Sequence, residues 1–126
     1  MKPVELHADS FHATVAKTGI LLVDWWATWC GPCRAFAPIF EKAAAAHPGV
    51  VFGKVDTDAE QGLAGQFGIQ SIPTLMIFRD GILLFAQPGV VPLQALHDLI
   101  KQAEALDMDQ VRREVAAANA QAGGGQ

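Results

Sequence analysis

The sequence is poor in cysteine, with only two in 126 residues. A disulfide-stapled small protein needs several bridges and a four-thiolate zinc site needs four cysteines, so two cysteines are too few for either class. Basic residues are also in the minority, since 9 lysines and arginines stand against 13 aspartates and glutamates and leave a net charge of −4. Because this balance gives phosphate backbones and anionic lipid no electrostatic reason to bind, we expect neither nucleic acid nor membrane as a partner.

Long hydrophobic runs and nucleotide-binding motifs are absent too. The longest apolar run, Ile20 to Ala27, is interrupted by Asp24 and is far shorter than the ~18 residues of a membrane helix. The N-terminus turns polar before the apolar region of a signal peptide could form, which predicts a cytoplasmic location. The sequence contains no Gly-x-Gly-x-x-Gly or Walker pattern, so we expect it to bind no cofactor itself.

The hydrophobic content, 51%, is enough to fill the core of one domain. Two runs that are apolar on both alternating faces predict central strands covered on both sides, and the helix formers between them complete a βαβ unit. The pair Asp80-Gly81 between two later apolar runs predicts a tight antiparallel hairpin. Strands are expected at residues 4–6, 20–27, 50–55, 74–79 and 82–87, and helices at 10–17, 32–47, 58–67 and 92–106.

This order of elements predicts an α/β fold in three layers, with a central mixed sheet of about five strands flanked by four helices. The domain is expected to span residues 1–106. Residues 107–126 form a C-terminal extension with sparser apolar residues that ends in three glycines. We expect a weak helix with a flexible Gly-rich tip there.

Both cysteines lie in one segment, Trp29-Cys30-Gly31-Pro32-Cys33, between a predicted strand and a predicted helix. Free amides and the positive end of the helix favour a thiolate at Cys30, and the thiolate is the nucleophilic form. Cys33, about one turn later and tucked further inside, is close enough to resolve a mixed disulfide formed by Cys30. Gly31 and Pro32 set the stiffness of the turn, and the pair predicts dithiol–disulfide exchange.

Three other interpretations of the pair stay open. Metal binding would need more ligands, and the four histidines are scattered without zinc-type spacing. A purely structural disulfide closing so short a loop would constrain the unfolded chain little. Inert thiols are also consistent with the sequence, because free cysteine packs as a small hydrophobe.

The cysteine motif, following Val23-Asp24-Trp25-Trp26-Ala27, resembles the active-site signature of thioredoxins. The resemblance covers about residues 3–106 and recurs in order at Ala37-Pro38-Ile39, Lys54-Val55-Asp56, Ile72-Pro73-Thr74, Asp80-Gly81 and Gly89. It implies a thioredoxin-like fold and a protein-disulfide reductase acting on protein substrates. The redox-active group would be the Cys30–Cys33 disulfide, with electrons from an NADPH-dependent flavoprotein, thioredoxin reductase. We expect a monomer.

Asp24 stands out because it interrupts a strand that is apolar on both sides. An unpaired buried carboxylate is costly, so its pKa should be raised by desolvation. The resemblance implies that this aspartate accepts and donates a proton for the second cysteine. The alternative is an aspartate at a strand end whose oxygens are satisfied by backbone donors.

Lys54 interrupts the next strand, and the resemblance implies a lysine near Asp24 that tunes its proton affinity. The alternative is a side chain that extends to solvent along the sheet. Trp25 and Trp26 should point to opposite faces as core residues. Trp29, just before the nucleophile, is expected at the rim, where aromatic residues often contact partners.

The resemblance also implies a cis bond before Pro73, beside the thiols, although an ordinary trans proline would also suit the start of a strand. With Gly89, this arrangement would leave the backbone of Ile72 and Gly89 free to pair with an extended substrate. Gly89 has a simpler interpretation as a turn residue. The loop at residues 87–92 departs most from the family pattern.

Two other functions compete with a reductase. The first is a disulfide oxidase or isomerase, but the Gly-Pro between the cysteines resembles the reductant class, since oxidants and isomerases usually carry a histidine there. The second is a binding or chaperone subunit whose thiols are incidental. Its only support is the extension at residues 107–126, where the charged residues are typical of a solvated helix face.

Overall fold

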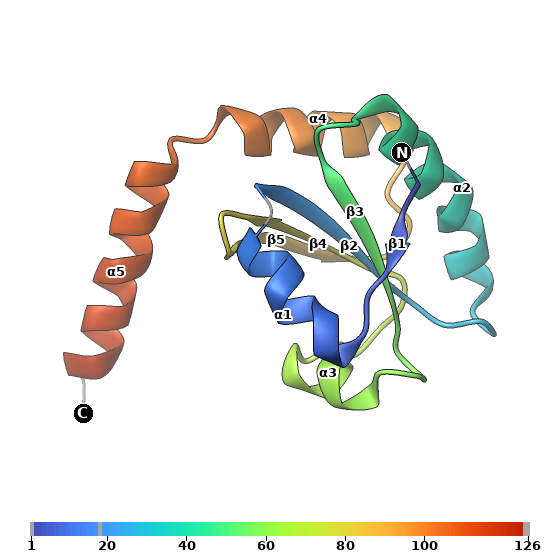
Figure 1. The fold of residues 1–126 in the computed structure, drawn as a ribbon, viewed down its shortest axis with the longest axis horizontal. Coiled ribbons are helices and arrows are strands. Elements are labelled where there is room, and N and C mark those ends of the chain that lie inside the picture. Colours follow the sequence, from blue (N-terminus) through green and yellow to red (C-terminus); the bar gives the residue numbers. More distant parts are fainter. Residues whose placement is uncertain (1, 18, 125–126) are drawn as a thin grey trace.

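The computed structural model describes residues 2–17 and 19–124, and its centre is one mixed sheet with helices on both faces (Figure 1). The strands follow the order β1-β3-β2-β4-β5 across the sheet. The first three in this order are parallel, whereas β4 is antiparallel to both β2 and β5. Their bounds are β1 Val4–Glu5, β2 Ile20–Trp26, β3 Val51–Asp56, β4 Thr74–Arg79 and β5 Ile82–Pro88.

Helices α1 and α3 cover one face of the sheet, and α2 and α4 cover the other. Their bounds are α1 Ala8–Lys17, α2 Gly31–Ala46, α3 Gln61–Gln66, α4 Leu93–Ala105 and α5 Met108–Gly124. The predicted α/β fold is confirmed. Helix α3 begins later than expected because the carboxylate of Asp56 accepts the amides of Asp58 and Ala59, which holds this stretch in a turn.

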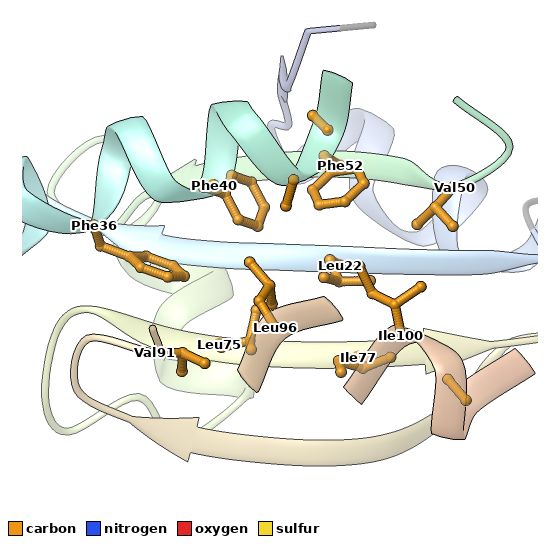
Figure 2. Packing of buried hydrophobic residues seen from close by; sticks show 13 residues of the cluster. Leu22, Phe36, Phe40, Val50, Phe52, Leu75, Ile77, Val91, Leu96 and Ile100 are labelled. Carbon is orange, nitrogen blue, oxygen red and sulfur yellow. The ribbon is translucent and has the colours of Figure 1, made fainter. Parts of the chain in front are cut away.

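The two faces of the sheet form separate hydrophobic cores, because strand side chains alternate between the faces. Figure 2 shows the core between the sheet and α2 with α4, where Leu22 packs with Phe36, Phe40, Leu96 and Ile100. All five side chains are fully buried. Any strand residue two positions from Leu22 therefore also faces α2, the helix that begins at the cysteines.

The hairpin between β4 and β5 confirms the prediction from Asp80-Gly81. Both residues have positive φ, 52° and 82°, which matches the twist that a two-residue hairpin loop needs. The strand before this turn ends at Arg79, whose guanidinium reaches the last turn of α4. Its Nη1 donates to the carbonyls of Ala103 at 2.7 Å, and of Glu104 and Leu106 at 3.2 Å.

Replacing Arg79 with methionine is expected to lower the free energy of unfolding by about 2 kcal/mol, because three carbonyls at the end of α4 lose a charged donor. Urea unfolding of the oxidised protein measures the change. The control is Arg112→Met, whose ion pairs with Asp80 and Asp109 lie on the exposed surface and contribute little. Equal midpoints for the two variants would contradict a capping role for Arg79.

The C-terminal extension forms the helix α5, which follows α4 and lies at one side of the molecule (Figure 1). Met108 is buried and Val111 is half-buried, whereas the rest of the helix whose side chains are described is exposed. The helix continues to Gly124, and the remainder of the expected flexible tip, Gly125 and Gln126, lies outside the described residues. Among the described residues, no helix combines the length and apolar character that crossing a bilayer requires.

Candidate active site

The cysteine pair lies where the sequence places it, at the start of α2. Cys30 is the N-cap residue and Pro32 stands in the first turn, a position that tolerates its missing amide. The two sulfurs are joined in a disulfide, so the interpretation as inert thiols is wrong. The sulfur of Cys30 accepts the backbone amide of Cys33 at 3.2 Å. This contact would stabilise a negative charge on Cys30 after reduction.

The expectation that Cys33 lies deeper than Cys30 is not reflected in their exposed fractions, which are 3% and 4%. What distinguishes the two sulfurs is their position on the helix. The N-cap sulfur faces the free amides of the first turn, whereas Cys33 is already inside the helix. Electrostatics, rather than burial, therefore favours Cys30 as the nucleophile.

The loop opposite the cysteines carries the expected cis bond between Ile72 and Pro73. The Ile72 carbonyl oxygen lies 3.7 Å from the sulfur of Cys30, and the Ile72 side chain packs against the cysteine cluster. Gly89 has φ 96°, a value that favours glycine, and its amide donates to the Pro73 carbonyl at 2.8 Å. The Gly89 amide is therefore not free for a substrate, because Pro73 already accepts it, whereas pairing of a substrate with the rest of the Ile72 and Gly89 backbone stays a prediction.

Asp24 lies within β2, flanked by Lys54 of β3 and Leu75 of β4. Its side chain is fully buried, and neither carboxylate oxygen has a hydrogen-bond partner among the described residues. The alternative prediction, that backbone donors at a strand end satisfy the carboxylate oxygens of Asp24, is therefore wrong. Burial raises the pKa of Asp24 to about 7, although the charge of Lys54 lowers it and that of Glu5 raises it.

The face of the sheet on which Asp24 lies connects it to the cysteines. Asp24 comes two residues after Leu22, which packs under α2, and two residues before Trp26, which packs against the cysteine cluster. The carboxyl group therefore lies on the side of the sheet covered by the helix that carries Cys33. A group with a pKa near neutrality on this face can exchange a proton under physiological conditions.

Lys54 lies beside Asp24 in the sheet register, as the resemblance implied. Its ammonium is 4.5 Å from the centroid of the Trp26 ring, a cation–π distance. Trp26 is therefore more than a core residue, since it lies between the lysine and the cysteine cluster. Trp25 points to the opposite core and is fully buried, as expected.

Trp29 is at the rim, with 67% of its surface exposed. Its indole nitrogen donates to the carboxylate of Asp58 at 2.8 Å, which holds the ring beside the cysteines. Sequence reasoning missed Asp58, because the two residues are 29 positions apart and no local pattern joins them. It also missed Glu5, which lies opposite Lys54 on β1. The one local signal for Glu5 is its chain neighbour Leu6, which is apolar. Because successive strand side chains point to opposite faces, Glu5 is expected on the face that Leu6 does not occupy.

The histidines lie away from the cysteine pair. His47 and His97 contact each other, with Nε2 and Nδ1 2.8 Å apart, where the C-terminal end of α2 meets α4. His7 and His12 belong to the region of α1. Within residues 2–17 and 19–124, no group of three or more histidine, cysteine, aspartate or glutamate side chains is arranged to hold a metal ion.

The thioredoxin family model matches residues 2–102, a segment that includes the cysteine pair, Asp24, Lys54 and the cis proline loop. The chain belongs to the thioredoxin family. It is 57% identical over 120 residues to a protein described as thioredoxin 2 of Streptomyces coelicolor, covering 95% of this chain and 90% of the relative. It is 36% identical to the thioredoxin of Bacillus subtilis, covering 81% and 98% of the two chains.

Solved thioredoxin structures share the fold. A mutant thioredoxin from Halobacterium salinarum superposes with a TM-score of 0.77 at 30% identity, covering 83% of this chain and 93% of the other. Oxidised mitochondrial thioredoxin 3 from Saccharomyces cerevisiae gives 0.74 at 32% identity, covering 79% and 94%. Family membership and the Cys-x-x-Cys pair together make this chain a thiol–disulfide oxidoreductase, a protein-disulfide reductase of the thioredoxin type.

Proposed function

We propose that this thioredoxin reduces disulfides in protein substrates with Cys30 as the attacking and Cys33 as the resolving residue. The observation that carries this assignment is the hydrogen bond from the Cys33 amide to the Cys30 sulfur at the N-terminus of α2. It supports a thiolate at Cys30 in the reduced protein. Gly31 and Pro32 shape the turn between the two sulfurs and so influence the redox balance.

The reaction consists of two exchanges. The Cys30 thiolate attacks one sulfur of the substrate disulfide, the S–S bond breaks, and the departing substrate sulfur takes a proton. Cys33 then loses its proton and attacks the Cys30 sulfur of the mixed disulfide. The second substrate sulfur leaves and is protonated, and the Cys30–Cys33 disulfide seen in the structure forms. The substrate gains two electrons from the two cysteines and two protons, while the dithiol gives up one proton when Cys30 ionises and one when Cys33 attacks.

Asp24 is the group that takes the proton from Cys33 in the second exchange and returns it when the protein is reduced again. Two observations support this role: the unpartnered carboxylate on the face covered by α2, and its pKa of about 7. Lys54 tunes this proton affinity, since its charge favours the ionised carboxylate.

Substrates dock on the rim formed by Trp29, Ile72, Pro73 and Gly89. Support comes from the exposed ring of Trp29 and from the Ile72 carbonyl close to the Cys30 sulfur. Gly89 contributes by holding the Pro73 carbonyl rather than by offering its own amide. An extended substrate segment placed here brings its disulfide to Cys30.

The redox-active disulfide serves in place of a bound cofactor, and the electrons come from an NADPH-dependent flavoprotein, thioredoxin reductase. Family membership supports this partner, because the relatives are named thioredoxins. We also place the protein in the cytoplasm as a monomer whose domain ends near Leu106.

Replacing Cys33 with serine is expected to trap a covalent complex, because Cys30 still attacks but nothing resolves the mixed disulfide. Incubating the reduced variant with a disulfide-containing protein should give one band of summed mass on a non-reducing gel, which dithiothreitol removes. The matched control, Cys30→Ser with Cys33 intact, should give little or none. A stronger complex from Cys30→Ser than from Cys33→Ser would reverse the assigned roles.

A further inference from the structure

Three charged residues form one row across neighbouring strands of the sheet. The register pairs Glu5 of β1 with Lys54 of β3, and Lys54 with Asp24 of β2. Their chain neighbours Leu6 and Val55 pack in the core on the opposite face, so all three point to the face covered by α2. Lys54 therefore has a carboxylate on either side, one fully buried and one exposed.

The row is open to solvent at the Glu5 end. A surface hollow is lined by Lys2, Glu5, Glu41 and Lys54, with Pro3 and Ala45. The ammonium of Lys54 can therefore be attracted outward by Glu5 or inward by Asp24, while its contact with the Trp26 ring keeps it near the row. The position of one cation thus couples an exposed carboxylate to a buried one.

The charges around the row act on both carboxylates. Lys54 lowers the pKa of Asp24, and Glu5 raises it. Burial raises the pKa of Glu5, Lys54 and His7 lower it, and Asp56 raises it. Lys2 and Glu41 are further charged groups beside the row, since they line the same hollow. A lysine paired with Asp24 alone would hold the carboxylate ionised over a wider pH range than one shared with Glu5.

We propose that Glu5 is a positioning residue, which shares the ammonium of Lys54 with Asp24 and so keeps the buried carboxyl group able to take up and release a proton. The inference rests on the proposed role of Asp24 in the second exchange. Glu5 is remote from the thiols and acts on Asp24 in two ways, through its own charge and through its share of the lysine between them.

The decisive variant is Glu5→Gln, which removes the charge at an exposed position and keeps the side chain's size. The readout is the pH titration of the Asp24 carboxyl carbon by NMR in the oxidised protein, in which the cysteines do not titrate. Strands are about 5 Å apart, so removing a charge two strands away should lower the proton affinity of Asp24 roughly two- to fourfold. The direction is downward because Asp24 loses a negative neighbour and gains a larger share of Lys54.

Two further variants separate the routes by which Glu5 could act. Glu41→Gln removes the same charge from the same hollow but outside the row, and it should leave the Asp24 titration unchanged. In a Lys54→Met background, Glu5→Gln should have a smaller effect than in the wild type. An equal effect in both backgrounds would overturn the action through Lys54, and an unchanged titration in Glu5→Gln would overturn the inference altogether.

Insulin reduction measured across pH distinguishes a failure of the role of Glu5 from a failure of the proposed proton-transfer role of Asp24. If Glu5 positions the lysine for catalysis, the pH profile of kcat/KM moves in the same direction as the NMR titration. A titration that moves without the profile would overturn the proton-transfer role of Asp24, and with it the positioning role of Glu5. An unmoved titration, with a pH profile that still depends on Asp24, would overturn the role of Glu5 alone.

Discussion

Replacing Cys30 with serine is expected to reduce the turbidity rate in the insulin assay with dithiothreitol to the level seen without protein. A serine hydroxyl does not ionise near neutral pH, so the hydrogen bond from the Cys33 amide has no thiolate to stabilise. Cys33, inside the helix and without this contact, cannot replace the lost nucleophile. The expected loss is the full rate enhancement over the reductant alone.

The matched control is Thr28→Ser, which changes an exposed side chain close to Cys30. The backbone carbonyl of residue 28, which accepts a hydrogen bond from Arg34, is unaffected by this change. This variant should keep the rate of the unmodified protein. Equal turbidity rates for Cys30→Ser and the unmodified protein would favour the binding or chaperone interpretation, in which the thiols are incidental.

The electron donor is tested by replacing dithiothreitol with NADPH and a thioredoxin reductase. Only proteins that keep Cys30 should then consume NADPH. If the unmodified protein consumed none, the proposed partner would be contradicted.

Replacing Asp24 with asparagine is expected to stabilise the fold at high pH. The folded-state pKa, about 7, lies above the ordinary value of 3.8, so the unfolded chain ionises more readily than the folded one. The buried carboxyl group therefore costs stability that grows as pH rises from about 4 to 7 and levels off above it, up to roughly 4 kcal/mol. Asparagine has no such ionisation, so its advantage should follow this curve.

Urea unfolding of the oxidised protein between pH 4 and 9 measures this difference. The two proteins should differ little at pH 4, where Asp24 is protonated in the folded state and only about half ionised in the unfolded state, and the variant should be more stable at pH 9. The control Asp58→Asn, at the rim, carries no comparable burial cost. A stability difference that is the same at pH 4 and pH 9 would show that Asp24 is not the titrating group.

The same replacement is expected to slow disulfide reduction at neutral pH by about tenfold or more, because Cys33 loses its proton acceptor. The pH dependence of kcat/KM near pH 7 should flatten in the variant. The opposite signs of the two effects matter, since a variant that is more stable and less active cannot owe its lost activity to unfolding. An unchanged pH profile would contradict the proton-transfer role.

Several parts of this protein follow from short stretches of sequence. Cys30 and Cys33 are three positions apart at a helix start, so their proximity depends only on local geometry. The hairpin at Asp80-Gly81 likewise depends on two residues that adopt positive φ. The central strands were predictable because their apolar runs alternate toward two cores. Each of these signals acts between chain neighbours, and the structure confirms all of them.

Other parts depend on residues that are distant in the sequence. Gly89 donates to Pro73, Trp29 to Asp58, and Arg79 to the end of α4. These partners are selected by strand register and helix packing, which no local pattern encodes.

The sequence by itself determined the redox chemistry of this thioredoxin, because the two cysteines and the helix start that distinguishes their positions are all local. Only the tertiary structure decided the surroundings that tune it. Asp24 is a proton carrier candidate because two cores and a sheet bury it, and Glu5 reaches it only through the register of β1 on β3 and β3 on β2. Proton affinity depends on burial and on neighbouring charges, and both are set when distant segments pack together.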